Sequence, residues 1–275
     1  MHKRILFLMD LEGVNNVVGV PYEGLAKDTE QWKVAIQPAP LEVNAAADAL
    51  FAAGAEEVAL WDNHGGCHNV DPASLDSRIK LLDVDLKQPR MSFAAGAFDC
   101  VCFFGYHAME GTLGGVLAHT MSSKVVQFYK VNGRYVGEVD MDAQIALSHG
   151  MPSCFFAGGD IACKQAEAAV PGIVTVVTKH EISRNEAEFR DNDALLAEIR
   201  EKITEAVQKD PRPAALQWPA KFEKSYKRME DAAAYLRKLH SLGIEAEHPA
   251  DDVMGRDAHT VTAVVNSISE YIKAI

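Results

Sequence analysis

The segment that decides the fold lies near the start of the chain and reads Ile5-Leu6-Phe7-Leu8-Met9-Asp10-Leu11-Glu12-Gly13. An apolar run followed by carboxylates and a glycine is typical of a buried strand in a parallel sheet. The run is too short for the core of a signal peptide or for a membrane span. We therefore expect a first strand that ends at Met9 and presents Asp10 and Glu12 at its carboxyl end.

Similar apolar runs recur along the chain and alternate with segments of helical periodicity. This alternation predicts an α/β fold with a mostly parallel sheet flanked by helices. The expected strands are Ile5–Met9, Glu57–Trp61, Val101–Tyr106, Ser153–Ala157 and Ile173–Thr178. Amphipathic helices are expected over residues 43–51, 139–149 and 192–207.

Two further signals divide the chain. Asn132-Gly133 predicts a hairpin between Val125–Lys130 and Arg134–Val136, an antiparallel insertion in the α/β domain. Pro211-Arg212-Pro213 then breaks the pattern, so we expect an α/β domain over residues 1–210 and a smaller α+β lobe over residues 211–275. The expected elements of the lobe are a strand near Ala215–Lys224, a helix near Glu230–His240, a strand near Ile244–Glu247 and a last helix from Thr260 to Ile272.

Composition and charge exclude several classes of protein. Hydrophobic residues make up 48% of the chain and charged residues 24%, as is ordinary for a folded domain. The 27 lysines and arginines are outnumbered by 39 aspartates and glutamates, and the net charge of -12 argues against nucleic-acid and membrane partners. The five cysteines form no C-x-x-C pair, which favours free thiols and a cytoplasmic protein.

Polar side chains follow the predicted strands at the point where each strand ends. Asp10 and Glu12 follow the first strand, His64 follows the second and His107 the third. Glu138 lies where the hairpin meets the next helix. Ligands of open α/β sheets bind beyond the carboxyl ends of the strands. Mixed histidine and carboxylate ligands suit zinc or a similar divalent ion, and this set is large enough for two ions that share a bridging carboxylate.

Each of these residues also fits a structural role when taken alone. Acidic residues after a strand are common helix caps, and Glu138 at a helix start complements the helix dipole. His64 fits a turn beside glycines, and His107 fits a satisfied core histidine. The expected convergence of all of them on one sheet edge is what favours a metal site.

Five separated motifs resemble the bacterial zinc-dependent D-aminopeptidase family of the DppA type. They are Asp10-x-Glu12-Gly13, Asp62-x-His64, Gly105-Tyr106-His107-Ala108, Ala118-His119-Thr120-Met121 and Val136-Gly137-Glu138. The resemblance covers about residues 4 to 185 and includes Ala157-Gly158-Gly159-Asp160 and Ile182-Ser183-Arg184. It implies an α/β fold and a metallopeptidase that removes N-terminal residues, D-amino acids in this family, from short peptides.

The resemblance also implies a role for each matching residue. Two zinc ions per chain would be bridged by Asp10, with Glu12 and His64 on one side and His107 and Glu138 on the other. A water held between the ions would attack the peptide, and His119 would act as a catalytic histidine without binding metal. The family further implies a ring-shaped homo-oligomer such as a decamer.

The chain departs from the family pattern at two places. It reads His64-Gly65-Gly66-Cys67-His68, so His68 stays open as a supporting, surface or ligand residue. The C-terminal lobe, with Asp251-Asp252-Val253-Met254-Gly255-Arg256-Asp257, matches the family pattern poorly.

Two other functions remain open. Asp10-Leu11-Glu12-Gly13-Val14 after an apolar strand resembles the nucleophile motif of haloacid-dehalogenase-like magnesium phosphatases, in which Asp10 would attack phosphorus. That family wants a second aspartate in place of Glu12 and has no use for His64 or His107, because magnesium prefers oxygen ligands. The third possibility is a metal-binding protein without catalysis, for which His119 would have no role.

Overall fold

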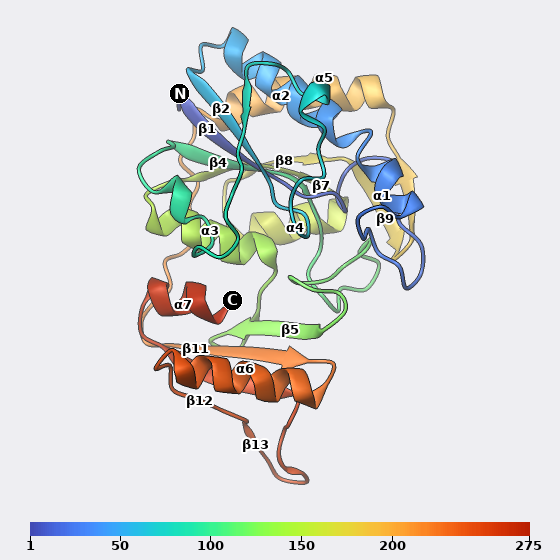
Figure 1. Cartoon of the computed structure of the whole chain (residues 1–275). Coiled ribbons are helices and arrows are strands. Elements are labelled where there is room, and N and C mark those ends of the chain that lie inside the picture. Colours follow the sequence, from blue (N-terminus) through green and yellow to red (C-terminus); the bar gives the residue numbers. More distant parts are fainter.

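The computed structural model describes all of residues 1–275 and is built around a six-stranded parallel sheet (Figure 1). Strand β1 lies near the middle of this sheet, where it pairs with a parallel strand on each side. Every residue of Ile5–Met9 is therefore buried. The order is β3-β2-β1-β4-β7-β8. The strands are β1 (Arg4–Met9), β2 (Glu57–Asp62), β3 (Ile79–Leu81), β4 (Cys100–Tyr106), β7 (Ser153–Gly158) and β8 (Val174–Val177).

Helices cover both faces of the parallel sheet (Figure 1). On one face α2 (Ala39–Ala52) and α5 (Asn192–Ala206) pack together over one apolar cluster of the sheet. On the other face α3 (Glu138–Ser148) and α4 (Asp160–Ala169) pack over a second cluster. The short helix α1 (Glu30–Ala35) belongs to the long loop after β1. None of the helices is both long and apolar enough to cross a bilayer.

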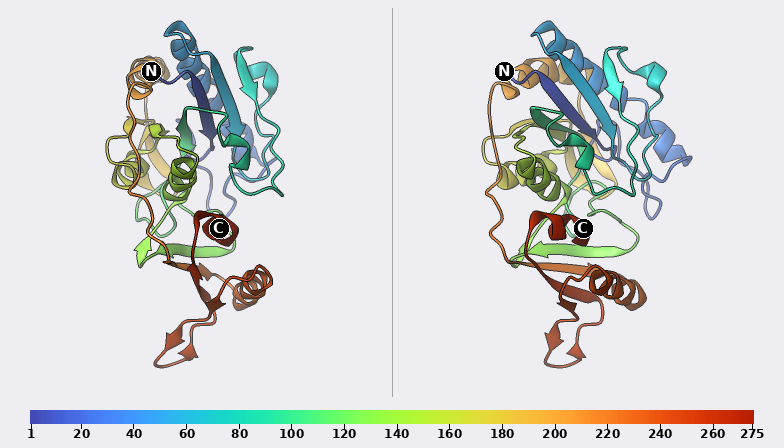
Figure 2. Two further views of the ribbon diagram at one scale, coloured as in Figure 1. Left: turned by 90° about the vertical axis from the view of Figure 1, so that its left-hand side faces the viewer. Right: turned by 60° about the vertical axis from the view of Figure 1, so that its left-hand side comes forward.

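A second sheet extends the molecule away from the first (Figure 2). It is antiparallel, has the order β12-β15-β11-β5-β6, and is covered by α6 (Met229–Ser241) and α7 (Ile268–Ala274). Its strands are β5 (Val126–Val131), β6 (Arg134–Tyr135), β11 (Ala220–Tyr226), β12 (Ala246–Glu247) and β15 (Thr260–Val265). Two small hairpins complete the fold: β9 (Lys179–Ser183) with β10 (Glu186–Phe189), and β13 (Ala250–Asp251) with β14 (Gly255–Arg256).

The predicted α/β class is confirmed, and one expectation about local structure needs correction. Residues 260–272 are not one helix, because Thr260–Val265 forms β15 and only Ile268–Ala274 is helical. The run Thr-Val-Thr-Ala-Val-Val is rich in β-branched residues and pairs with β11, and such contacts override an apolar spacing that looked helical.

The predicted antiparallel hairpin is confirmed: β5 and β6 pair with each other and lie in the chain between β4 and α3. Strand β5 pairs with β11, so the second sheet combines residues 126–135 with the C-terminal part of the chain. The helix α3 that follows the hairpin returns to the first sheet. The chain passes between the two sheets more than once. Its division into two domains at residue 210 stays a prediction.

Candidate metal centre

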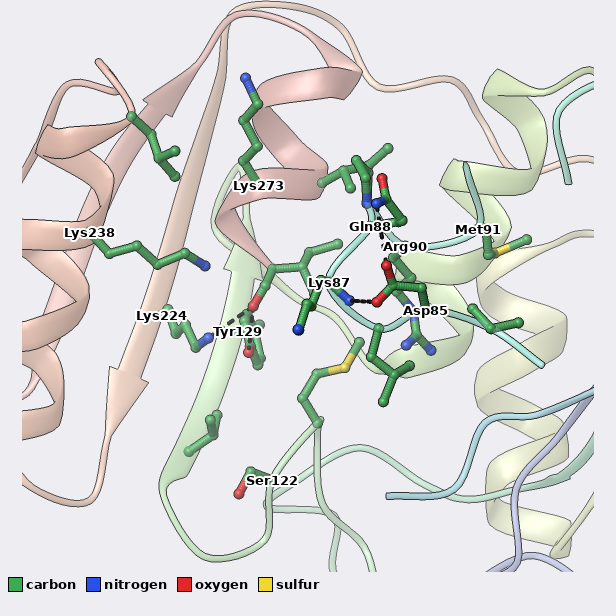
Figure 3. A pocket seen from close by; sticks show the side chains of 18 of the residues that line it. Asp85, Lys87, Gln88, Arg90, Met91, Ser122, Tyr129, Lys224, Lys238 and Lys273 are labelled. Carbon is green, nitrogen blue, oxygen red and sulfur yellow. Dashed lines mark hydrogen bonds between the residues drawn. The ribbon is translucent and has the colours of Figure 1, made fainter. Parts of the chain in front are cut away.

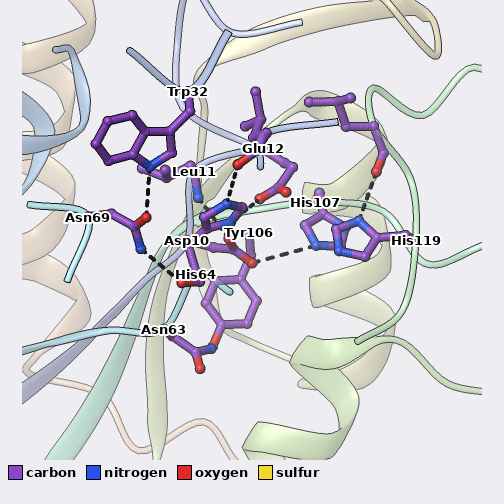
Figure 4. A network of polar contacts seen from close by, with 12 residues as sticks. Asp10, Leu11, Glu12, Trp32, Asn63, His64, Asn69, Tyr106, His107 and His119 are labelled. Carbon is purple, nitrogen blue, oxygen red and sulfur yellow. Dashed lines mark hydrogen bonds and ion pairs between the residues drawn. The ribbon is translucent and has the colours of Figure 1, made fainter. Parts of the chain in front are cut away.

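The residues predicted from the strand ends come together at the carboxyl edge of the parallel sheet (Figure 4). Asp10 and Glu12 follow β1, His64 follows β2, and His107 follows β4. Glu138 is the first residue of α3. Asp10, Glu12, His107 and Glu138 are all buried, which is rare for ionisable groups that have no functional or structural partner.

Two glycines allow β1 and β4 to deliver these side chains at close range. The Gly13 N–H donates to the Gly105 carbonyl at 2.7 Å, and Gly105 has a φ of +66°. A Cβ on Gly13 would lie 1.9 Å from the Tyr106 carbonyl oxygen, and one on Gly105 would lie 2.1 Å from the Asp10 carbonyl oxygen. Any larger residue at either position would push the segment bearing Asp10 away from the segment that leads to His107.

On one side of Asp10, His64 contacts both carboxylates of the first strand end. Its Nδ1 lies 2.8 Å from Asp10 Oδ1 and 3.1 Å from Glu12 Oε2. Its Nε2 lies 2.9 Å from the carbonyl oxygen of Leu25. When Nε2–H donates to that carbonyl, the Nδ1 lone pair faces the carboxylates and is available to a cation.

On the other side of Asp10, His107 lies between two carboxylates. Its Nε2 is 3.5 Å from Asp10 Oδ2 and 3.4 Å from Glu138 Oε1. The ring of His119 stacks on that of His107, with centroids 4.0 Å apart, and its Nε2 is 3.8 Å from Glu138 Oε1. One oxygen of Asp10 thus faces His64 and the other faces His107, which is the arrangement that a bridging carboxylate requires.

Backbone carbonyls orient His107 and His119 in the same way. Their Nδ1 atoms lie 3.0 Å from the Ala108 oxygen and 2.9 Å from the Leu117 oxygen, so Nε2 of each ring points toward Glu138. His107 Nε2 is buried and has no hydrogen-bond partner. Ligand histidines are held by such second hydrogen bonds, and an unpartnered buried nitrogen beside carboxylates fits a zinc-type donor set.

The mutual contacts change the proton affinities of the cluster. Burial disfavours the charged form of His64, but the neighbouring Glu12 and Asp10 outweigh it and raise its pKa to about 12. Burial also opposes ionisation of Asp10, yet its contacts with His107 and His64 lower the pKa of that carboxyl. Without a cation the cluster therefore holds His64 and His107 protonated, and metal binding would release those protons.

A buried polar chain connects the segments that carry His64, His107 and Glu138. The Asn63 amide donates to the Tyr106 hydroxyl at 2.8 Å, and this hydroxyl donates to Asp142 Oδ2 at 2.7 Å. Arg90 binds both oxygens of the same carboxylate, at 2.5 and 2.7 Å. The sequence analysis missed this chain, although Asp142 lies one helical turn after Glu138 in α3, and that spacing is a usable signal.

A buried lysine anchors the loop after Glu12, and sequence reasoning missed it as well. Lys179 Nζ donates to the carbonyl oxygens of Glu12 at 2.6 Å and Val14 at 2.9 Å, and also to that of Val17. Thr178 donates its hydroxyl to the Gly13 carbonyl. Because Lys179 is fully buried and burial lowers its pKa to about 8, it holds this loop against the end of β8 with no contact to solvent.

His68, left open by the sequence, lies away from the cluster. Its side chain is 68% exposed and its nearest carboxylate is Asp83, at 3.8 Å. Asp62 of the same motif is buried but accepts hydrogen bonds from Asn69 and Val70, and Asn69 in turn binds the His64 carbonyl at 2.8 Å. Asp62 therefore shapes the loop that carries His64.

Two neighbouring cavities open on this side of the molecule. A cavity of about 310 Å³ lies over the cluster and is lined by Asp10, Glu12, His64, His119 and Glu138 among others. A larger cavity of about 580 Å³ lies between the two sheets and is lined by apolar residues, lysines and Arg90 (Figure 3). Arg90, Met121 and Ser122 border both. Only the smaller one is lined by the histidines and carboxylates of the cluster.

Comparisons with known proteins agree with this geometry. A family model described as D-aminopeptidase, peptidase family M55, matches residues 3–245. A D-aminopeptidase of Bacillus subtilis strain 168 is 34% identical over 147 residues, which span 52% of this chain and 52%, about half, of that enzyme.

The fold of a solved structure is also similar. The zinc-dependent D-aminopeptidase DppA from Bacillus subtilis, described as a self-compartmentalizing protease, matches with a TM-score of 0.84 at 23% identity. The match covers 98% of this chain and 94% of that one, which shows that the two share their α/β fold. Because the family model spans most of the sequence, the chain belongs to the D-aminopeptidase family, peptidase family M55.

Proposed function

We propose that this protein is a zinc-dependent aminopeptidase that removes N-terminal residues, D-amino acids in particular, from short peptides. The observation that carries the proposal is the buried His107 Nε2, which has no hydrogen-bond partner and faces Asp10 and Glu138. A phosphatase that uses Asp10 as nucleophile would need neither His107 nor His64. Family membership and the activity of the Bacillus subtilis relative support the same substrate class.

Two metal positions are supported by the arrangement of donor atoms. Asp10, Glu12 and His107 form one group of close donor atoms, and His107, His119 and Glu138 form another. With His64 against Asp10 and Glu12, we assign Asp10 as the bridge, Glu12 and His64 to one ion, and His107 and Glu138 to the other. Zinc at these positions would lower the pKa of water toward about 7 and polarise the scissile carbonyl.

The protein side chains supply the remaining chemistry. Zinc held by the carboxylates of the cavity would also bind the neutral amine of the peptide and so position its first residue. His119 lines the same cavity, and its Nδ1 faces the Leu117 carbonyl, so its Nε2 faces the reacting groups. We assign His119 to carry a proton to the leaving amine, since it stacks on His107 and is not needed to complete either proposed ion.

The same proposal includes a ring-shaped homo-oligomer, such as a decamer, in the cytoplasm. The similar structure is described as a self-compartmentalizing protease, and closure of a cavity would restrict access to short peptides. All five cysteines are buried and unpaired, which suits a reducing compartment. Light scattering on purified protein should return a multiple of the chain mass, and a monomer at micromolar concentration would contradict the assembly.

The function is tested by a substrate screen with the zinc-loaded protein. D- and L-aminoacyl amides and dipeptides should be compared at equal concentration, with chelator-treated protein as the control. We expect hydrolysis of the D-series that is lost on chelation and restored by zinc. Hydrolysis of a phosphomonoester with magnesium, together with no cleavage of any peptide, would replace the proposal with the phosphatase alternative.

A further inference from the structure

The cavity over the cluster has an acidic floor and two unpaired basic side chains. Asp10, Glu12 and Glu138 line it on the side of the histidines, and Lys124 and Arg184 also border it. Arg90, the third cation of the lining, is already paired with Asp142. Neither Lys124 nor Arg184 lies within ion-pair distance of any carboxylate of the chain.

Arg184 is held in place by the segment that precedes His119. Its backbone carbonyl accepts a hydrogen bond from the Leu117 N–H at 2.8 Å, and its Nη1 donates to the Ala118 carbonyl at 2.6 Å. These contacts engage one nitrogen of the guanidinium and leave its other N–H groups without a protein acceptor. A fixed guanidinium with free donors matches the geometry of a carboxylate.

Lys124 adds a second, more mobile positive charge to the same cavity. It lies in the loop before β5, is exposed, and makes no side-chain hydrogen bond. Glu23, the remaining unpaired charge of the lining, comes from the loop after β1. In a chain with a net charge of -12, two unpaired cations in one cavity favour an anionic group of the ligand at that place.

We propose that Arg184, assisted by Lys124, binds the terminal carboxylate of a short peptide whose amino end lies over Asp10, Glu12 and Glu138. The inference rests on the proposed peptidase function and narrows its substrate class to peptides of two or three residues with a free carboxyl group. A cavity of about 310 Å³ is at the small end of ligand sites, which agrees with that size. Arg184 thereby becomes a specificity-determining residue.

The test compares a D-alanyl dipeptide with its C-terminal amide, which differs only in the carboxylate. The zinc-loaded parent should prefer the free acid by roughly 10- to 100-fold in kcat/KM, because hydrogen bonds to a charged group are the stronger ones. Arg184→Gln should bring the ratio close to one, mainly through KM for the acid. Lys124→Gln should lower the ratio by a smaller factor, and it alters no hydrogen bond of the fold.

Lys164→Gln is the matched control, since Lys164 is an exposed and unpaired lysine of α4 outside the cavity. It removes the same charge and should keep the ratio of the parent. If Arg184 only positions the His119 segment, Arg184→Gln will slow both substrates equally and keep the ratio. That result, or equal use of acid and amide by the parent, overturns the inference.

A binding measurement separates this inference from the proposed function. Calorimetric titration of the zinc-loaded protein with non-hydrolysable analogues of the same two dipeptides requires no turnover. Tighter binding of the acid in the parent, lost in Arg184→Gln, supports the carboxylate site even if no peptide is hydrolysed. Equal binding of acid and amide contradicts it even if the protein proves to be an aminopeptidase.

Discussion

The two sheets of this protein bury charged groups in opposite ways. In the parallel sheet, His107 is 6% exposed and its Nε2 has no partner apart from the carboxylates that it faces. In the antiparallel sheet, Lys224 is 7% exposed, but its Nζ donates to the Ile275 carbonyl at 3.0 Å. That nitrogen also lies 4.7 to 5.2 Å from the ring centres of three tyrosines, Tyr129, Tyr226 and Tyr235.

The difference teaches how to distinguish a functional from a structural buried charge. The buried Lys224 nitrogen finds its contacts within the chain, from the Ile275 oxygen and the three rings, although burial and the nearby Lys238 disfavour its charged form. In the His107 cluster the buried Nε2 has no hydrogen-bond partner and faces two carboxylates, which fits the proposed metal. Parallel strands favour this because their carboxyl ends meet at one edge, whereas neighbouring antiparallel strands point their ends in opposite directions.

The largest effect is expected at Asp10, the shared member of the functional cluster. Asp10→Ala removes the carboxylate between His64 and His107, so both ions should be lost and turnover should fall by more than about 10⁴-fold. Elemental analysis should approach two zinc ions per chain for the parent and none for the variant. Asp193→Ala, an exposed aspartate in the first turn of α5, is the control and should keep both ions. Retention of one or two ions by Asp10→Ala would show that Asp10 is not the bridge.

His119→Ala should give the next largest loss of turnover. It also tests whether His119 is one of the metal ligands of the cluster. As a proton carrier, His119 should contribute roughly 10²- to 10⁴-fold to turnover without contributing to metal binding. The variant should therefore keep the zinc content and melting temperature of the parent. Loss of one ion would show that His119 binds that ion together with His107 and Glu138. Turnover within about threefold of the parent would leave it no catalytic role.

Lys224 provides a stability test in the second sheet. Burial, together with the nearby Lys238, lowers the pKa of Lys224 from 10.5 to about 7 in the folded protein. Between these pH values the unfolded chain binds one more proton than the folded protein, so stability should rise by up to about 5 kcal/mol as the pH rises from about 7 to about 10.5. Denaturant unfolding at several pH values should show this slope in the parent and not in Lys224→Met. The zinc content of Lys224→Met should equal that of the parent. Loss of zinc in this variant would show that Lys224 of the second sheet also supports the metal centre of the first.

Glu42 of α2 should give a smaller effect of opposite sign. Burial raises its pKa from 4.5 to about 7; one oxygen accepts from the Asn15 N–H at 2.9 Å and the other has no partner. The folded protein binds the extra proton between these values, so stability should fall by up to about 3 kcal/mol as the pH rises from about 4.5 to about 7. Glu42→Gln should flatten this part of the unfolding profile. An unchanged slope would mean that Glu42 is ionised in the folded protein.

Much of the parallel sheet and its candidate site could be predicted because the signals are local. An apolar run that ends in polar residues marks a buried strand and its carboxyl end together, as at Met9 and Asp10. The residues predicted from such ends, with Glu138 at a helix start, do lie together in the structure. The second sheet was harder, because Thr260–Val265 carries a pattern that suits a helix or a strand until β11 pairs with it.

The sequence by itself determined five of the six strands of the parallel sheet and the polar side chains at their ends, since both follow from the order of apolar and polar residues; the short edge strand β3 (Ile79–Leu81) was missed. Only the tertiary structure decided what supports those side chains. Lys179 binds the Val14 carbonyl, although the two residues are 165 positions apart in the sequence. Arg90 binds Asp142, which is 52 positions away. No local pattern encodes such contacts, because they depend on how far apart the folded backbone places two segments. Arg184, the residue after β9, likewise lies near His119 only in the folded protein, where it forms hydrogen bonds with Leu117 and Ala118.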